Sequence, residues 1–187
     1  MFIYIPNKTE ERIIVMDTEY SEQHLIQFSS LMLQKTSFNR DIYQLVGSSN
    51  VYIVPDKPIS HFTTKYTGLT NSFIRENGVS KEDFHKFIQE FLSDVNSDVV
   101  IVAHGIRNDL KVLRNVGIDF QCKVDCTLEM SKKILGKETD LRLVDIAADA
   151  GLILNFAHHS YSDAIATLAV YSFLKTIEAE ANKKWNS

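Results

Sequence analysis

Two short, almost wholly apolar segments constrain the fold more than any other feature of the chain. Residues 13–16 read Ile-Ile-Val-Met, and residues 99–103 read Val-Val-Ile-Val-Ala. Alternate residues of a strand face opposite sides of a sheet, so a strand that is apolar at both parities suits burial on both faces. The two segments therefore predict buried strands in a sheet that is flanked by helices.

Other early segments predict further strands. A second strand is expected at residues 25–33. Residues 43–46 and 51–54 flank the sequence Gly-Ser-Ser-Asn at positions 47–50, which predicts another strand region with a turn inside it.

After residue 80 the apolar residues recur at helical spacing. Ser80 and Asp83 match a capping box. The apolar residues that follow have the spacing of an amphipathic helix: Phe84, Phe87, Ile88, Phe91 and Leu92. A helical pattern begins again at Leu110, and further helices are expected at residues 128–135, 141–150 and 161–181, with a short strand at residues 122–126.

The order of these elements indicates the fold class. Three early strands followed by alternating helices and strands predict an α/β domain with a mixed central sheet, antiparallel in its first strands and then parallel where helices cross over. The chain has 187 residues with only three prolines and seven glycines, and it lacks a Pro- or Gly-rich linker. A single domain over residues 1–187 is therefore expected.

Composition narrows the classes of function and location. A net charge of -4 argues against a protein that coats duplex nucleic acid by charge alone. The first residues lack the apolar stretch of a signal peptide, and no segment is apolar enough to span a membrane. Cys122 and Cys126 match neither a redox motif nor half of a common zinc site, so free thiols and a cytoplasmic location are expected.

Asp17 and Glu19 follow the first buried strand. Residues two apart in a strand project from the same face, so the two carboxylates converge. Such a pair needs protons or cations, and hard divalent ions with oxygen ligands are the simplest solution. The alternative is a solvated acidic strand end, because residues 178–180 repeat the acid-x-acid pattern with no catalytic reason.

Two more acidic positions occur at helix starts. Asp109 follows the strand at residues 99–103, and Asp163 precedes the last apolar helix pattern. Each could serve only to stabilise the amino terminus of its helix. Ligand sites in α/β sheets nevertheless collect at the carboxyl ends of strands, and His158 adds an imidazole whose ordinary pKa suits a general base.

The motifs MDTEYSE, AHGIRNDLKVL and HHSYSDAIATLAVY resemble, in order, the three motifs of the DnaQ-like 3′-5′ exonucleases of the DEDDh type. The resemblance covers residues 13–174 and implies a ribonuclease H-like fold. It implies that Asp17, Glu19 and Asp163 hold one Mg²⁺ or Mn²⁺ ion. Asp17 would share a second ion, which Asp109 assists directly or through water.

The same resemblance assigns the general base and the substrate contacts. Family members have the histidine five residues before the last aspartate, which selects His158 over His159. Thr18 and Tyr20 would lie beside the terminal nucleotide, and Leu69 would pack on terminal bases. The chain departs from the family at Gly105, where an asparagine is usual, and after Glu19, where small threonines are common. The second motif is closer to RNA-processing members than to polymerase proofreaders.

The resemblance therefore implies hydrolysis of single-stranded nucleic acid from its 3′ end, with release of nucleoside 5′-monophosphates. Two alternatives remain open: an inactive ribonuclease H-like module that binds nucleic acid or protein, and a metal-dependent phosphoesterase that acts on small nucleotides. The sequence does not distinguish DNA from RNA. It also leaves open a homodimer and a polymerase or RNA-processing partner.

Overall fold

The computed structural model describes residues 1–93, 98–136, 141–154 and 158–185. Within them the chain forms a six-stranded sheet in the order β1-β4-β3-β2-β5-β6. The strands are β1 (Phe2–Tyr4), β2 (Arg12–Ser21), β3 (His24–Lys35), β4 (Ile42–Tyr52), β5 (Val99–Ala103) and β6 (Lys123–Cys126). Strands β1 to β4 pair antiparallel, whereas β5 runs parallel to β2 and β6 parallel to β5. The mixed sheet expected from the sequence is confirmed.

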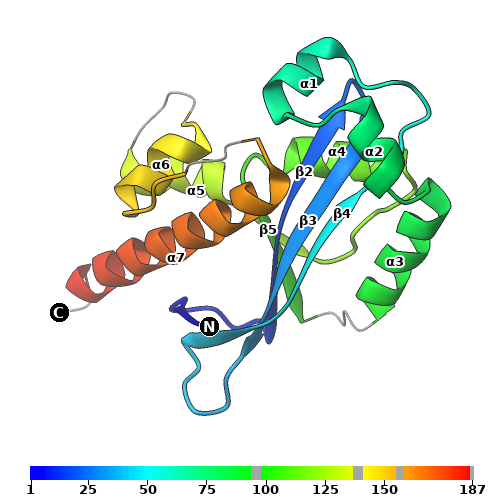
Figure 1. Ribbon diagram of the computed structural model, residues 1–187. Coiled ribbons are helices and arrows are strands. Elements are labelled where there is room, and N and C mark those ends of the chain that lie inside the picture. The colour runs from blue at the N-terminus through cyan, green and yellow to red at the C-terminus, as the bar shows by residue number, and fades with distance from the viewer. Residues whose placement is uncertain (94–97, 137–140, 155–157, 186–187) are drawn as a thin grey trace.

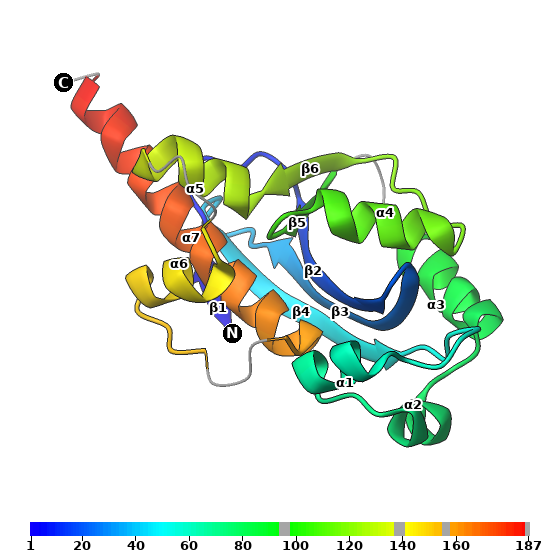
Figure 2. The ribbon, with the colours of Figure 1, turned by 90° about the horizontal axis from the view of Figure 1, so that it is seen from above.

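Helices cover both faces of this sheet (Figures 1 and 2). Helices α3 and α4 lie on one face, and α7 with α5 and α6 lies on the other. The helices are α1 (His61–Thr67), α2 (Asn71–Asn77), α3 (Lys81–Ser93), α4 (Arg107–Asn115), α5 (Thr127–Leu135), α6 (Leu143–Asp149) and α7 (Ser160–Trp185).

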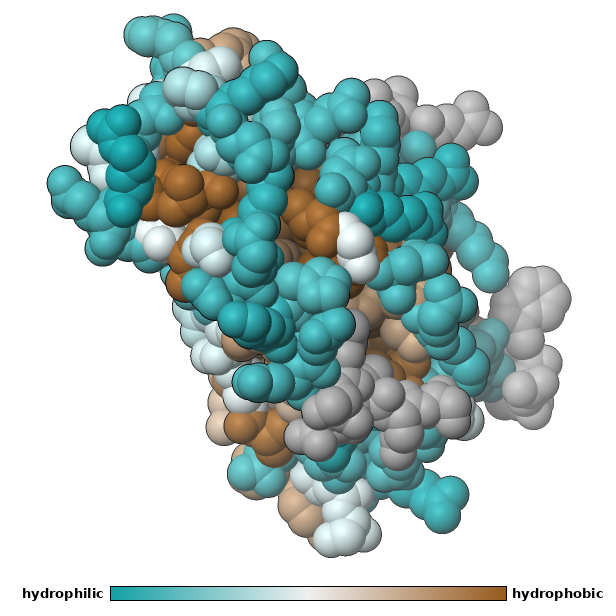
Figure 3. Space-filling model, turned by 90° about the vertical axis from the view of Figure 1, so that its right-hand side faces the viewer, coloured by the Kyte–Doolittle hydropathy of each residue, from teal (hydrophilic) through white to brown (hydrophobic). Residues whose placement is uncertain are grey.

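Alternate apolar residues of β2 pack on opposite faces of the sheet. Ile14 and Met16 pack in the cluster that contains Phe84 of α3. Ile13 and Val15 pack in the opposite cluster, against α7. A strand that is apolar at every position is thus explained by burial on both faces. Figure 3 faces the side of α3, where hydrophobic side chains are visible in recesses between hydrophilic ones, as expected for a helix with one buried face.

The turn expected at residues 47–50 is wrong. Strand β4 continues from Ile42 to Tyr52, and its polar residues pair with β3. The Ser30 and Ser49 hydroxyls lie 2.7 Å apart, and Ser29 donates to the Asn50 amide oxygen at 3.0 Å. These cross-strand bonds satisfy side chains that would otherwise favour a turn.

Most helix expectations are confirmed. The capping box is present, since the Ser80 hydroxyl accepts from the Asp83 N–H at 3.1 Å. Helix α5 ends at Gly136, which has a left-handed conformation (φ 63°). Helix α6 is shorter than expected, and residues 137–140 lie outside the described residues. Helix α7 starts at Ser160 and is longer than expected.

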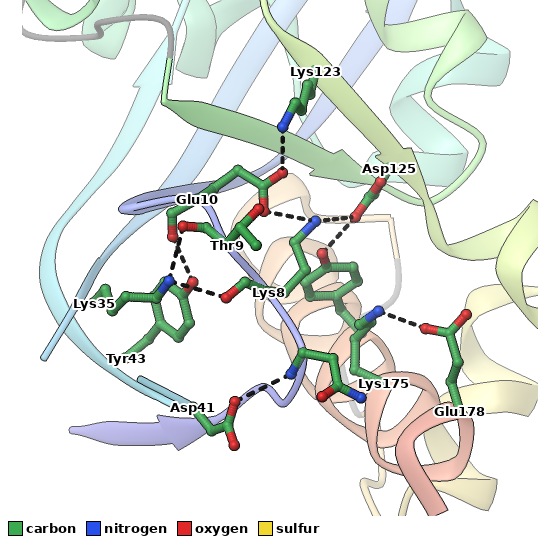
Figure 4. A network of polar contacts seen from close by, with 12 residues as sticks. Lys8, Thr9, Glu10, Lys35, Asp41, Tyr43, Lys123, Asp125, Lys175 and Glu178 are labelled. Atoms are coloured by element: carbon green, nitrogen blue, oxygen red, sulfur yellow. Dashed lines mark hydrogen bonds and ion pairs between the residues drawn. The ribbon is translucent and has the colours of Figure 1, made fainter. Parts of the chain in front are cut away.

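A network of charged and polar side chains ties the segment before β2 to β6 and α7 (Figure 4). The Lys8 ammonium lies 3.0 Å from a Glu10 carboxylate oxygen and 3.1 Å from Asp125, and Lys123 reaches Glu10 at 3.0 Å. The Tyr171 hydroxyl of α7 donates to Asp125 at 2.5 Å. The network therefore fixes the chain at the amino-terminal end of β2.

Two further expectations concern cysteines and membranes. Cys122 and Cys126 are both free thiols. Among the helices of the described residues, none combines the length and the hydropathy that crossing a bilayer requires.

Candidate active site

The carboxyl-terminal half of β2 presents acids to the same face on which its apolar residues meet α7. Because Ile13 and Val15 face α7, the alternation of the strand puts Asp17 on that side as well. Helix α7 brings Asp163 in its first turn. One carboxylate oxygen each from Asp17, Glu19 and Asp163 can be chosen so that all three lie within 4.8 Å of one another. The structure therefore unites the first and third sequence motifs.

Asp109 approaches from the other side of β2. Its side chain is 5% exposed, and its Oδ1 accepts hydrogen bonds from the Thr18 N–H at 3.1 Å and the Thr18 hydroxyl at 2.8 Å. Through these two bonds Asp109 ties the first turn of α4 to strand β2. Asp109 is outside the close group of three carboxylates, but its charge raises the pKa of Asp17.

These acids open into a pocket of about 300 Å³. It is lined by Asp17, Thr18, Glu19, Tyr20, Phe62, Thr63, Tyr66, Thr67, His158 and Asp163. The pocket thus contains three of the four expected acids, the expected base, and two of the expected substrate contacts. Its remaining lining comes from α1, which the sequence interpretation did not include.

His158 and His159 have different surroundings. The His158 N–H donates to Asp163 Oδ2 at 2.9 Å, and its ring lies against the Tyr66 ring with 3.7 Å between centroids. His159 instead places its Nε2 3.2 Å from the Tyr52 hydroxyl and 3.4 Å from the Gln27 amide nitrogen. Only His158 lines the pocket.

Leu69, expected at the terminal bases, does not line this pocket. It is 6% exposed and packs with Ile26, Ile59 and Ile74. Phe62 and Tyr66 are the aromatic residues of α1 at the pocket instead. Sequence signals for α1 were present, because Ser60 and Gly68 are a typical helix start and stop, but seven residues are too few for a clear periodicity.

Burial and mutual repulsion make these carboxylates hold protons unusually strongly. Removal from water, with the charges of Asp109, Asp163 and Glu19, raises the pKa of Asp17 well above its ordinary value. Burial and the charges of Asp163 and Asp109 raise the pKa of Glu19 to about 8. Burial also raises the pKa of Asp109 to about 7 and that of Asp163 to about 6. Cations would relieve this repulsion.

The donor set fits divalent cations. Asp163 Oδ1 is buried and has no hydrogen-bond partner. In the part of the chain that the structure describes, no lysine or arginine forms an ion pair with Asp17, Glu19 or Asp163. Clustered carboxylate oxygens that lack protein cations are the ligands that Mg²⁺ and Mn²⁺ prefer.

Comparison with known proteins agrees with this geometry. The model of a family described as Exonuclease (RNase_T) matches residues 14–171. The chain belongs to this exonuclease family. The match contains all three motifs, and it confirms the resemblance to the DnaQ-like exonucleases.

Curated relatives of this exonuclease domain are much longer proteins. DNA polymerase III PolC-type of Caldanaerobacter subterraneus is 27% identical over 139 residues, which cover 72% of this chain and 9% of the polymerase. Small RNA degrading nuclease 3 of Arabidopsis thaliana is 36% identical over 86 residues, or 46% of this chain and 10% of that protein. The chain thus spans about a tenth of the length of these relatives.

Solved structures share the fold at low sequence identity. Escherichia coli exonuclease I in complex with a dA16 oligonucleotide matches with a TM-score of 0.74 and 19% identity, covering 91% of this chain and 42% of that one. Exonuclease X in complex with 5′ overhanging duplex DNA matches with a TM-score of 0.67 and 16% identity, covering 89% and 93%. The ribonuclease H-like fold expected from the sequence is confirmed.

Proposed function

We propose that this protein is a metal-dependent 3′-5′ exonuclease that hydrolyses single-stranded nucleic acid and releases nucleoside 5′-monophosphates. The observation that carries the proposal is the convergence of Asp17, Glu19 and Asp163 beside His158 in one pocket. Membership in the exonuclease family supports it. A domain that only bound nucleic acid would have no chemical need for buried carboxylates that repel one another.

The acids divide into two roles. Asp17, Glu19 and Asp163 would hold one Mg²⁺ or Mn²⁺ ion, and Asp17 with Asp109, directly or through water, would hold a second. A pair of such ions supplies a polarised water and stabilises the charge on the departing 3′-oxygen. Thr18 fixes the orientation of Asp109 through two hydrogen bonds, so it acts as a positioning residue as well as a wall of the pocket.

His158 would accept the proton of the attacking water. Burial lowers the pKa of its imidazole, so the ring is unprotonated at neutral pH. The hydrogen bond from its backbone N–H to Asp163 Oδ2 ties the base to one of the proposed metal ligands. An unprotonated imidazole beside the metal ligands would be able to accept a proton at neutral pH.

The proteins that share the fold support the proposed substrate class. Exonuclease I of Escherichia coli was solved with dA16 and with dT13 oligonucleotides. A single strand would fit the charge of this chain, because an end in a metal-filled pocket needs less positive surface than a duplex. Because the relatives include a PolC-type DNA polymerase and a small RNA degrading nuclease, both DNA and RNA are candidate substrates, and a polymerase is a candidate partner.

A single assay tests the activity and its direction. Strands of DNA and RNA labelled at the 5′ end are incubated with Mg²⁺, and matched strands carry a blocked 3′ terminus. The expected result is a ladder that shortens from the 3′ end, loss of activity in excess EDTA, and resistance of the blocked strands. Glu19→Gln should be inactive with Mg²⁺, because the first ion loses a charged ligand.

Four outcomes would contradict the proposal. Full activity in excess EDTA would exclude the metal mechanism. Internal cleavage of blocked strands at the unblocked rate would indicate an endonuclease. Strand binding with no degradation in Mg²⁺ or Mn²⁺ would indicate a binding module, and turnover only of nucleotide monoesters would indicate a phosphoesterase.

A further inference from the structure

The segment between β4 and α3 carries positive charge in a chain whose net charge is -4. No aspartate or glutamate occurs in the sequence between Asp56 and Glu76. The residues between these two acids include three cations: Lys57, Lys65 and Arg75. Figures 1 and 2 show the two helices of the segment, α1 and α2, beside each other at the end of the sheet where β2 finishes. The cations therefore lie at the same end of the molecule as the pocket of Asp17, Glu19 and Asp163, called the carboxylate pocket below.

A second pocket, of about 220 Å³, opens between the loop after β4 and helix α2. Val54, Pro58 and Ile74 give it apolar walls, and Lys57 and Arg75 contribute two cations. It shares no lining residue with the carboxylate pocket, so it is a separate site. Cations beside apolar walls fit a phosphate with its attached sugar, whose carbon atoms can pack on the apolar side chains.

The protein does not neutralise the two cations of this second pocket. Among the residues that the structure describes, neither Lys57 nor Arg75 forms an ion pair, and both are exposed. Asp56 is the one acid among the described lining residues, and Lys81 pairs with it from outside the pocket. The lining therefore keeps an excess of positive charge, which an anion would balance.

The larger cavity, near the start of β2, has no comparable excess of charge. Its volume is about 740 Å³, and its cations Lys8, Lys35 and Arg40 are accompanied by Glu11 and Asp41 in the lining. Lys8 is also paired with acids outside this cavity. The ammonium of Lys35 donates to two backbone carbonyl oxygens. The smaller pocket is thus the better candidate for an anionic ligand.

Hydrogen bonds hold the walls of the second pocket in place. The Val54 N–H donates to the Val79 carbonyl oxygen at 2.9 Å. The Asn71 side chain accepts from the Ile59 N–H at 2.7 Å and donates to the Ile59 carbonyl oxygen at 3.1 Å, so it ties the loop to α2. The loop also contains two prolines, which restrict its backbone. The pocket is therefore preformed, and a ligand binds without the cost of ordering it.

We propose that Lys57 and Arg75 bind a phosphate of the nucleic-acid strand on the 5′ side of the nucleotide that is removed. The inference rests on the proposed function and adds to it a second anchoring site for the substrate. The 3′ end of the strand occupies the carboxylate pocket, so a phosphate in the second pocket belongs to an earlier nucleotide. Lysine and arginine contact phosphate oxygens without reading the base, so the site is independent of sequence.

The second pocket makes binding depend on strand length. A strand that is long enough to reach both pockets gains a contact that a shorter strand lacks, and this second contact forms within one complex. A mononucleotide reaches only one pocket at a time. Strands above a threshold length therefore bind more tightly than mononucleotides and very short strands.

The salt dependence of binding tests the phosphate contact without turnover. The probe is a 5′-fluorescein dT12 strand with a 3′-terminal phosphorothioate linkage, followed by fluorescence anisotropy in Ca²⁺ over a series of KCl concentrations. One phosphate contact of a single strand contributes about 0.7 to the slope of log Kd against log salt concentration. The double variant Lys57→Gln/Arg75→Gln should lose about 0.7 of this slope and raise Kd on the order of 10-fold at low salt. The charge-keeping variant Lys57→Arg/Arg75→Lys should retain the slope.

Lys132→Gln/Lys133→Gln is the matched control. It removes the same two positive charges from α5, which packs with α6 and α7 and which Figure 2 shows away from α1 and α2. Neither lysine lines the second pocket. The slope and Kd of this control should match those of the wild type, and equal melting temperatures show that each variant is folded. Equal losses of slope in the two glutamine variants would mean that net charge alone decides, and would overturn the site.

A methylphosphonate series locates the bound phosphate. One phosphodiester of dT12 at a time is replaced by a neutral methylphosphonate, and Kd is measured for the wild type and for Lys57→Gln/Arg75→Gln. At one internal position the replacement should raise the wild-type Kd on the order of 10-fold and leave the Kd of the variant unchanged. Equal effects in both proteins at every position would show that these two residues bind no phosphate of the strand.

The two proposals fail in different ways. If the wild type binds dT12 but degrades no strand, the proposed function is wrong, and the salt slope of Lys57→Gln/Arg75→Gln still decides on the second pocket. If the wild type degrades strands from the 3′ end and this variant keeps its slope and its methylphosphonate profile, the exonuclease stands and the phosphate site is wrong. If the variant loses affinity for dTMP but not for dT12, the pocket binds free nucleotides, and the proposed contact with the strand is again wrong.

Discussion

The backbone of His158 lies in the left-handed region, with φ at +66°, which residues other than glycine and asparagine rarely adopt. Such strain persists only where neighbouring contacts hold it. Here the His158 N–H is bound by Asp163, and the next residues are fixed because the Ser160 and Ser29 hydroxyls lie 2.6 Å apart. The loop before α7 is thus built to keep one imidazole at the carboxylates.

Replacing this imidazole should affect catalysis far more than folding. We expect His158→Asn to lower kcat by about 10²–10⁴, the usual contribution of a general base, while the melting temperature changes little. Asparagine is chosen because it tolerates the left-handed region, whereas alanine there would add strain. The check is kcat on one single-stranded substrate, with calorimetry of Mg²⁺ or Mn²⁺ binding. A kcat near that of the wild type would remove His158 from the mechanism.

The neighbouring histidine should behave in the opposite way. His159 lies between Tyr52 and Gln27, so His159→Ala removes the partner of the Tyr52 hydroxyl, whereas the Gln27 amide nitrogen keeps its hydrogen bond to Asn50 Oδ1. We expect a loss of about 1–3 kcal/mol in the free energy of unfolding, measured by urea denaturation. The kcat of the folded fraction should fall much less than that of His158→Asn. A stable but inactive His159→Ala protein would reverse the assignment of the base.

At the scale of helices and strands, Gly78 and Gly47 allow a matched comparison of Gly→Ala substitutions. A Cβ added to Gly78, just after α2, would lie 2.5 Å from the Ile74 carbonyl oxygen, so the backbone must shift. A Cβ added to Gly47, within β4, would meet nothing closer than the Met32 Cβ at 3.9 Å. We expect Gly78→Ala to cost about 1–3 kcal/mol of stability and Gly47→Ala to be neutral or slightly stabilising. Urea denaturation of both variants checks this, and equal losses would contradict it.

The elements also show what the sequence could predict. Long or fully apolar segments were predictable. Burial on both faces gives β2 and β5 continuous apolar runs, and one buried face gives α3 its helical spacing of apolar residues. Short elements were not. Strand β1 has three residues, and helices α1 and α2 have seven each, so neither period can develop. In β4 the residues at 47–50 are typical of turns locally, and the pairing with β3 overrides them.

The residues of the candidate site also differ in how far the sequence predicts them. Asp17, Glu19, Asp163 and His158 could be assigned from motif spacing, because each motif follows an element that the sequence predicts. The aromatic lining of the pocket could not be predicted, because it depends on which side of a short helix faces the pocket. Leu69 was therefore expected there, and Phe62 and Tyr66 were missed.

At the scale of the whole molecule, β2 joins two polar clusters with opposite electrostatics. Before the strand, burial alone would raise the pKa of Glu10, but hydrogen bonds from its own backbone, Lys123 and Lys8 lower it to about 2. Beyond the middle of the strand, Asp17 and Glu19 have no such cationic partners among the described residues, and burial and the neighbouring carboxylates raise their pKa values. The fold is thus stabilised by charge at one end and, in the absence of metal ions, destabilised by it at the other.

The last prediction concerns the carboxylate cluster at Asp17 and Glu19. Their raised pKa values decide whether stability rises or falls with pH. In metal-free protein the folded state keeps protons on Glu19, with a pKa of about 8, and on Asp17, whereas the unfolded chain has lost them above its ordinary values near 4. Stability therefore falls as pH rises towards and through 8. Between pH 7.0 and 8.5, Glu10 is ionised in both states and contributes no change. Burial lowers the pKa of His104 and His158, so these groups oppose the trend, but only slightly, because the unfolded chain has already lost most of its histidine protons at pH 7. We expect the free energy of unfolding in EDTA to fall by on the order of 1 kcal/mol, seen as a melting temperature about 2–4 °C lower at pH 8.5.

Saturating Mg²⁺ at pH 8.5 should restore the melting temperature. Asp163→Asn, with one charge fewer, should show a smaller loss and a smaller response to Mg²⁺. A melting temperature in EDTA that is unchanged between these pH values, with no response to Mg²⁺ or Mn²⁺, would mean that the four carboxylates are not a cation site.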